Sequence, residues 1–277
     1  MDRPIAAFDI ETIPDPAAGR RLLGLSGTDA EVVAAMVERR RLETDGRSDY
    51  PELPLHRIVT IGVAWLDPGT GRFKLGTCGA DTTDERTMLD AFFDVFRRAR
   101  EAPRIVSWNG NGFDLPVIRY RAMMHGLAAP ELHRTDGEWR WNNYQNRYHD
   151  MHVDLMDTVG GYGASKWISL DLLSQAMGLP GKRFVEEPVY AHVLRGEHAL
   201  VRDYCKLDVV HTLLLYLVWE VHRGRLSHEA LRHHLATICQ ALGGEAYEGW
   251  RDVCAVLATW PEWRPEAEVL FDAAAGA

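Results

Sequence analysis

Long apolar runs are missing from this sequence of 277 residues, so no segment is predicted to span a membrane. The first residues also lack the charged-then-apolar pattern of a secretory signal. Hydrophobic residues make up 46% and charged residues 26%, which is ordinary for a soluble globular protein and does not indicate disorder. We therefore expect a cytoplasmic protein.

Cysteine is scarce, and its four residues are widely spaced, with no C-x-x-C pair. This spacing argues against a zinc site or a redox pair built on paired cysteines, and it favours reduced structural thiols. The twelve histidines lack acidic partners at ligand spacing, so we interpret them as surface or core residues. The cysteines are Cys78, Cys205, Cys239 and Cys254.

Positive charge is in deficit, because the formal net charge is −9. A protein that coats nucleic acid nonspecifically needs many Lys and Arg contacts to phosphates, so this class is disfavoured. An enzyme with a local basic groove is not excluded. Carboxylates that hold metal ions add to the negative count, and bound cations reverse the sign of the local field.

No internal repeat is present, and the apolar periodicity alternates between strand and helix patterns. Strands are predicted at residues 5–10, 57–66, 73–78 and 104–108. Helices are predicted at residues 84–100, 115–125, 170–177, 188–194, 197–222, 227–242 and 245–258. Between the first two strands, Val32, Val33, Met36 and Val37 fall at helical spacing, which predicts a surface helix with a solvated basic end. The alternation implies an α/β fold with a mixed sheet.

The chain length fits one large domain or two small ones, and we expect one domain with an appendage. Residues 1–226 would form the α/β domain, and residues 227–277 a C-terminal helical extension packed on the same domain. Whether the extension pads the core or makes an oligomer contact stays open.

Two acidic residues, Asp9 and Glu11, end the first predicted strand two positions apart, so their side chains project from one face. Two carboxylates at such a short distance repel one another unless a cation offsets their charge. Mg²⁺ and Mn²⁺ prefer oxygen ligands of this type. The alternative is an exposed strand end where both acids meet water. For this pair alone, that alternative is favoured.

Asp114 follows a glycine-rich turn at the end of another predicted strand, so the fold can bring it beside Asp9. An Asp that opens a helix is also an ordinary N-cap, and Asn109, Gly110 and Gly112 are ordinary turn residues. Taken alone, the capping role is the better interpretation.

Asp208 lies on the apolar stripe of the long helix predicted at residues 197–222, where a carboxylate needs a partner or a metal. Tyr204 lies one turn earlier on the same face, so its hydroxyl can reach toward whatever Asp208 binds. A core tyrosine bonded to a buried aspartate is the alternative. Two cations held by such carboxylates, about 3.5 to 4 Å apart, suit in-line displacement at phosphorus.

These residues resemble the DEDD superfamily of 3′-to-5′ exonucleases, in its tyrosine subclass. The matching motifs are FDIET at residues 8–12, NGNGFDLP at residues 109–116 and Y-x-x-x-D at residues 204–208. More narrowly, HVDLMD at residues 152–157, GYG at residues 161–163 and SLDLL at residues 169–173 resemble stand-alone bacterial predicted exonucleases related to the proofreading domain of family B DNA polymerases. The resemblance implies a ribonuclease H-like fold over roughly residues 4–224.

The resemblance also implies roles for single residues. Asp9, Glu11 and Asp208 would bind one divalent metal, and Asp9 would bind a second with Asp114 acting largely through water. Tyr204 would orient the attacking water. The residues implied to contact the terminal nucleotide are Thr12, Ile13, Asn109 and Phe113, for which turn and core roles are alternatives.

The histidine subclass carries His-x-x-x-x-Asp, and His198 to Asp203 fits that spacing. Asp203 lies about 140° from Asp208 on a regular helix, so the two cannot face one site. Because Asp208 occupies the apolar stripe, the tyrosine subclass is favoured. Asp154 and Asp157 are surplus to the motif and would be supporting groups or helix caps.

Residues 133–149 interleave aromatic residues with arginines, which suits stacking on unpaired bases. A hairpin around Trp139 and Trp141, packed on the core, is slightly favoured over that role. The leading hypothesis is a Mg²⁺- or Mn²⁺-dependent 3′-to-5′ exonuclease acting on single-stranded 3′ ends, with DNA favoured and any protein partner unknown. The alternatives are an RNA exonuclease or oligonucleotide phosphodiesterase, and a nucleic-acid-binding module without turnover.

Overall fold

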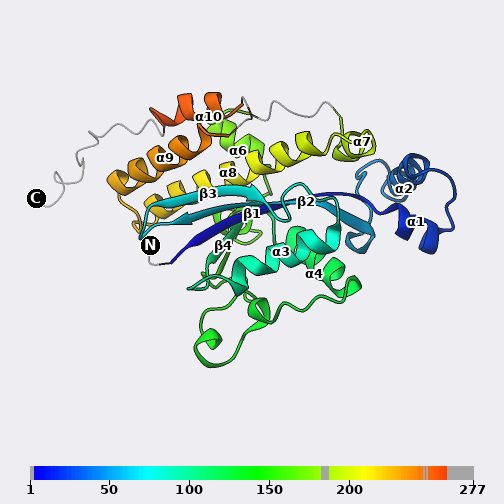
Figure 1. Ribbon diagram of the computed structural model, residues 1–277, viewed down its shortest axis with the longest axis horizontal. Coiled ribbons are helices and arrows are strands. Elements are labelled where there is room, and N and C mark those ends of the chain that lie inside the picture. Colours follow the sequence, from blue (N-terminus) through cyan, green and yellow to red (C-terminus); the bar gives the residue numbers. More distant parts are fainter. Residues whose placement is uncertain (1–2, 182–186, 246, 248, 261–277) are drawn as a thin grey trace, which may run out of the picture.

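The computed structural model describes residues 3–181, 187–245, 247 and 249–260, and in this part of the chain a mixed sheet has the order β3-β2-β1-β4-β5 (Figure 1). The strands are β1 (Ile5–Pro14), β2 (His56–Asp67), β3 (Arg72–Thr77), β4 (Arg104–Ser107) and β5 (His152–Asp154). β2 is antiparallel to β1 and β3, whereas β4 is parallel to β1 and β5. The predicted α/β fold with a mixed sheet is confirmed, and the arrangement is consistent with a ribonuclease H-like exonuclease.

Helices cover both faces of this sheet. They are α1 (Pro16–Leu23), α2 (Asp29–Glu43), α3 (Glu85–Arg97), α4 (Asp114–Met124), α5 (Leu155–Val159), α6 (Leu170–Ala176), α7 (Val189–Leu194), α8 (His198–His222), α9 (His228–Leu242) and α10 (Gly249–Leu257). In Figure 1, α8 runs along one face with α9 and α10 outside it, and α3 and α4 lie on the opposite face. Although α8 has 25 residues, neither it nor any other described helix is long and apolar enough to cross a membrane.

The alternation of side chains along β1 divides the core into two layers. Ile5 and Ala7 pack with α8, whereas Ala6, Phe8 and Ile10 pack with α3 and α4. A central strand covered on both faces is apolar on both, which explains its continuous hydrophobic run. Asp9 and Glu11 continue the series that begins at Ile5 and Ala7, and therefore face α8.

β1 continues four residues beyond the predicted end at Ile10 and stops at Pro14. Main-chain pairing with β2 sustains it, although the residues after Ile10 are no longer uniformly apolar. Glu11 pairs with Thr60 and Thr12 pairs with Ile58, so the register shifts at this point and β2 contributes an extra residue, Val59. Such bulges bend a strand and occur often beside active sites.

The insertion between β1 and β2 contains α2, whose predicted apolar face is confirmed. Val32, Val33, Met36 and Val37 are all at most 4% exposed. The predicted solvated basic end is confirmed for Arg39 and Arg41, whose side chains are 53% and 48% exposed, whereas Arg40 is half-buried. Arg39 forms an ion pair with Glu43 of the same helix, and Arg40 and Arg41 pair with Glu52 and Asp49 of the segment that follows. Arg40 also donates to the carbonyl of Tyr50 at 2.9 Å, which fastens residues 49–52 to α2.

The predicted hairpin at Trp139 and Trp141 is wrong. Residues 130–140 form two short 3-10 turns, Pro130–His133 and Gly137–Arg140, and the chain then folds back on itself. The Asn143 side chain accepts hydrogen bonds from the main-chain N–H groups of Gln145 and Asn146, both at 3.0 Å. Such local bonds give the backbone an alternative to a strand ladder.

The C-terminal helices share one core with the sheet. Leu231, Leu235 and Ile238 of α9 and Trp250 of α10 belong to the same buried cluster as Ile5. α10 begins at Gly249, later than the predicted residue 245, and residues 246 and 248 lie outside the described part, as do residues 261–277. The division of the chain at residue 226 stays a prediction.

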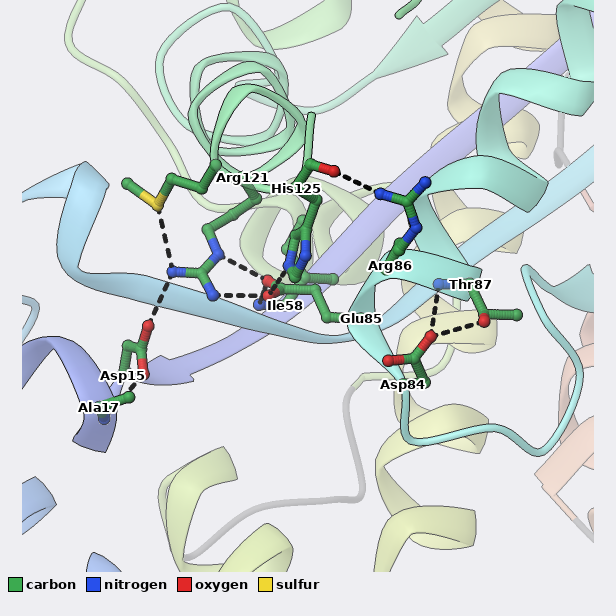
Figure 2. A network of polar contacts seen from close by, with 10 residues as sticks. Asp15, Ala17, Ile58, Asp84, Glu85, Arg86, Thr87, Arg121 and His125 are labelled. Atoms are coloured by element: carbon green, nitrogen blue, oxygen red, sulfur yellow. Dashed lines mark hydrogen bonds and ion pairs between the residues drawn. The ribbon is translucent and has the colours of Figure 1, made fainter. Parts of the chain in front are cut away.

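A buried ion-pair network ties together four elements near the end of β1 (Figure 2). The Arg121 guanidinium of α4 lies 2.8 Å from the Asp15 carboxylate and 2.5 Å from the Glu85 carboxylate. Glu85 also accepts from the main-chain N–H of Ile58 at 2.7 Å and contacts His125 at 2.8 Å. The network thus joins the chain after β1 to the starts of β2 and α3 and to the second half of α4.

Candidate active site

Asp9 and Glu11 of β1 meet Cys205 of α8 on one face of the sheet. One ligand atom from each side chain lies within 4.8 Å of the other two, and this is the one such cluster found among the described residues. The Cys205 thiol donates to the main-chain carbonyl of Asp9 at 3.4 Å and to its carboxylate at 3.7 Å. Asp9 and Glu11 therefore lie on one face of β1, as predicted, and α8 places the Cys205 thiol beside them.

Gly62 of β2 allows α8 to approach this closely. It pairs with Asp9 across the sheet. A Cβ atom at Gly62 would lie 2.9 Å from the Cys205 sulfur and 2.8 Å from a methyl carbon of Val209. Any larger residue would push α8 away from β1 and separate the thiol from the acids.

Asp208 joins this group from the next turn of α8 and is 6% exposed. Burial, and then the charges of Asp9, Glu11 and Asp208, raise the pKa of the Cys205 thiol well above its usual range. The charges of the three carboxylates therefore act together on one uncharged thiol. Asp203 has a different environment, because it forms an ion pair with Lys206 at 2.9 Å and its side chain is 29% exposed.

Asp114 reaches the site from the opposite side of the sheet, and its predicted N-cap role is wrong. It is the first residue of α4, where Phe113 is the cap residue and provides no side-chain hydrogen bond. β4 pairs with β1 only as far as Ala7, so β4 forms no ladder with the main chain of β1 after Ala7. The Ile10 N–H donates to the Asp114 carboxylate at 3.1 Å instead.

The pKa of Asp114 also depends on the charges of other acidic residues. Burial, and then the charges of Asp154 and Asp208, raise the pKa of the Asp114 carboxyl to about 7, against the hydrogen bonds from main-chain N–H groups. A carboxyl held among negative groups in this way gains most from a nearby cation. Oxygen donors of this kind suit hard divalent ions such as Mg²⁺ and Mn²⁺.

The Asn109 loop (residues 109–113) lies between β4 and Asp114, and hydrogen bonds to Asp154 hold its main chain in place. The Asp154 carboxylate accepts from the main-chain N–H groups of Asn109 and Asn111, both at 2.9 Å. Asn109 itself has a left-handed backbone with φ of +64°, a conformation that few residues adopt without support. Asp154 also accepts from the Asp157 N–H at 3.4 Å and caps α5, so its predicted alternative as a helix cap is confirmed.

A cavity of about 160 Å³ opens beside Glu11, and Thr12 and Phe113 line it together with Tyr50, His56 and Tyr190. The His56 ring lies parallel to Tyr50 and edge-on to Phe113, with ring centroids 6.2 and 5.2 Å apart. Its Nε2 lies 3.1 Å from the Pro51 carbonyl, which can only accept, and its Nδ1 lies 2.9 Å from the Thr12 hydroxyl. Burial lowers the pKa of His56, so the neutral ring accepts from Thr12.

Asn109 lines a second, more open cavity of about 520 Å³, which shares Tyr50 and Phe113 with the first. Ile13 lies elsewhere, because its side chain is 1% exposed and packs with Val193 and Val201. Only its main chain could meet a nucleotide, and its predicted role stays a prediction. A third cavity, of about 550 Å³, is lined by Arg3, Trp139 and their neighbours, and none of the predicted site residues lines it.

A family model for a predicted 3′-5′ exonuclease related to the exonuclease domain of PolB matches residues 48–257, which is more than half of the chain. The chain belongs to this family. No curated protein matches it. The family match begins after β1, so Asp9 and Glu11 lie outside it. The sheet nevertheless places β1 between β2 and β4, which both lie within the match.

Two residues of this exonuclease show what sequence reasoning reached and what it missed. Tyr204 is half-buried in α8, one turn before Asp208, and its subclass role stays a prediction. Cys205 was interpreted as structural, although it lies three positions before Asp208 and so shares its helix face. Helix phase was the signal that could have identified it.

Proposed function

We propose that this exonuclease hydrolyses phosphodiester bonds from the 3′ end of single-stranded nucleic acid, with DNA favoured, by a two-metal-ion mechanism. The observation that supports this most is the meeting of Asp9 and Glu11 at the Cys205 thiol, with Asp208 one turn further along α8 and close enough for its charge to act on that thiol and on Asp114. These acids come from a strand and two helices that are far apart in the sequence. The relation of the family to PolB supports DNA as the substrate.

We propose ligands for the two cations from the resemblance and from the oxygen donors present. Asp9, Glu11 and Asp208 would hold the first, and Asp9 and Asp114 the second, with Asp114 acting largely through water. When bound, the cations supply positive charge for the attacking and leaving oxygens of an in-line displacement at phosphorus. Tyr204 would orient the attacking water through its hydroxyl, on the same helix face as Asp208.

The aromatic cavity beside Glu11 suits the terminal nucleoside. The Phe113 ring offers a face for stacking, and the neutral His56 ring fixes the direction of the Thr12 hydroxyl. We propose that Thr12 and Phe113 bind the terminal sugar and base, and that Asn109 contacts the nucleotide from the adjoining open cavity.

The function is tested with 5′-labelled single strands of DNA and RNA of one sequence, incubated with the full chain and Mg²⁺ or Mn²⁺. We expect a ladder that shortens from the 3′ end, faster for DNA, and complete loss of cleavage when EDTA removes the metal. A 3′-blocked strand is the matched substrate control and should stay intact.

Four outcomes contradict the proposal or part of it. Cleavage that continues in EDTA excludes the metal mechanism, and internal cuts in the 3′-blocked strand indicate an endonuclease. Binding of the strands without shortening, under every metal, indicates a module without turnover. Faster cleavage of RNA than of DNA would assign the same site to ribonucleic acid.

The role of Tyr204 is tested by Tyr204→Phe against His198→Ala. Loss of the Tyr204 hydroxyl is expected to lower kcat by about tenfold or more, since positioned proton-handling groups contribute roughly 10²–10⁴-fold. KM and the stabilisation of the fold by Mn²⁺ should not change. His198→Ala should keep the wild-type rate, and the reverse pattern in single-turnover assays would favour the histidine subclass.

A further inference from the structure

The aromatic residues between α4 and β5 divide into a buried set and an exposed set. Trp139 and Tyr144 pack inward, and Tyr144 is 3% exposed with its ring 5.5 Å from Phe96. Trp141 and Tyr148 are 78% and 66% exposed. Core packing therefore explains the position of the first pair but not that of the second pair.

Tyr148, Tyr162 and Arg147 form an exposed cluster that we name the stacking platform. The two tyrosine rings lie 4.8 Å apart at 60°, and Tyr162 is 37% exposed. The Arg147 guanidinium lies 5.8 Å from the centre of the Tyr148 ring and 5.5 Å from that of Tyr162. Aromatic faces beside a guanidinium are the chemistry with which proteins bind unpaired bases and their phosphates.

The backbone at Tyr162 is strained in a way that presents this side chain. Tyr162 has a φ of +56° between two glycines that are also left-handed, Gly161 and Gly163. Its N–H donates to the Asp157 carbonyl at 2.6 Å, which fixes the turn. A tyrosine held in a costly conformation with its ring against another exposed tyrosine points to a binding role.

The platform is fastened to the Asn109 loop through one carboxylate. Arg147 forms an ion pair with Asp157 at 2.8 Å, and the Asn111 side chain donates to the other oxygen of Asp157 at 3.2 Å. Asn111 lies three residues before Asp114. The platform is therefore connected to the loop that carries one of the four catalytic carboxylates.

The Asn109 loop separates two binding regions. Its Phe113 side faces His56 and the aromatic cavity, whereas its Asn111 side faces Asp157 and Arg147. The loop therefore lies between the aromatic cavity and the platform, so a strand that runs from the cavity across the loop reaches the platform. On the basis of the proposed function, we propose that the platform binds bases of the same single strand upstream of the scissile bond.

Binding is measured by fluorescence anisotropy with 5′-fluorescein oligothymidylates of three and twelve nucleotides, with Ca²⁺ in place of Mg²⁺ to prevent cleavage. For Tyr148→Ala and Tyr162→Ala, we expect the Kd of the longer strand to rise about tenfold, as for loss of one stacked base. The Kd of the shorter strand should stay within about twofold. Hydrolysis of the p-nitrophenyl ester of thymidine 5′-monophosphate, which occupies only the active site, should not change.

Two control variants separate stacking from loss of structure. Tyr148→Phe keeps the ring and should bind both strands like the wild type. Tyr120→Ala removes a tyrosine that is 40% exposed on α4 and should also leave both Kd values unchanged.

The platform is overturned if the alanine variants bind the longer strand normally, which would assign the surface to another partner, such as a protein. It is also overturned if the alanine substitutions weaken binding of the shorter strand and hydrolysis of the ester by as large a factor as binding of the longer strand. A wild type that binds the longer strand through the platform but cleaves nothing would support the platform and contradict the proposed function.

Discussion

Asp208→Asn is expected to reduce the exonuclease rate by roughly 10³-fold or more. The substitution keeps the size of the side chain but removes the charge that would hold a cation between β1 and α8. Lewis-acid stabilisation is worth several kcal/mol, and each 1.36 kcal/mol corresponds to about a tenfold change in rate. The measurement is the initial rate of shortening of a 5′-labelled single strand in saturating Mn²⁺.

Asp203→Asn is the matched control for this prediction, because Asp203 lies in the same helix and forms a half-buried ion pair with Lys206. It should retain the wild-type rate within about twofold, as expected for a partly exposed pair. Thermal unfolding of Asp208→Asn without metal should stay within a few degrees of the wild type, which separates lost catalysis from lost structure. An active Asp208→Asn would remove Asp208 from the catalytic group, and an inactive Asp203→Asn would favour the histidine subclass.

Four of the five described strands were predictable because hydrophobic periodicity reports local geometry, whereas β5, with three residues, is too short to show it. The run at the start of β1 predicted a buried strand, and the same period assigned Asp9 and Glu11 to one face. The strand continues to Pro14 because β2 supplies main-chain partners from residues 56–58, more than forty positions away. Periodicity within β1 carries no information about that pairing.

The hydrogen bond of Asp114 with the main chain of β1 could not be predicted for a related reason. An Asp before a helix satisfies a local capping rule, and nothing nearby in the sequence contradicts it. Its actual partner is the N–H of Ile10, 104 residues earlier, and the bond forms because β4 stops pairing with β1 at Ala7. A tertiary hydrogen bond to β1 here replaces the local helix-capping bond that Asp114 would otherwise form.

The platform shows a third limit, which concerns residue types. Large aromatic residues are often buried, and the sequence does not say which of them are exceptions. Tyr144 and Tyr148 are four residues apart in one segment, yet the first lies in the core and the second is exposed. Contacts of Tyr148 and Arg147 with the distant Gly-Tyr-Gly turn decide this difference.

The buried network of Arg121 carries the largest predicted effect on stability. Arg121→Met would leave the carboxylates of Asp15 and Glu85, which are 9% and 6% exposed, without their guanidinium. Removing one partner of a buried ion pair costs about 3–5 kcal/mol. In a chain of this size that corresponds to a fall in Tm of roughly 10 °C, measured by circular dichroism or calorimetry.

Arg97→Met is the matched control, because Arg97 bonds Asp90 and Asp94 on its own helix with its side chain 31% exposed. Its cost should not exceed about 1 kcal/mol. If uncompensated charge is the cause in Arg121→Met, adding Glu85→Gln should cost less than the two single substitutions together, by about 0.5–3 kcal/mol. Strictly additive costs would instead attribute the loss to packing of the Arg121 side chain between α3, α4 and the end of β1.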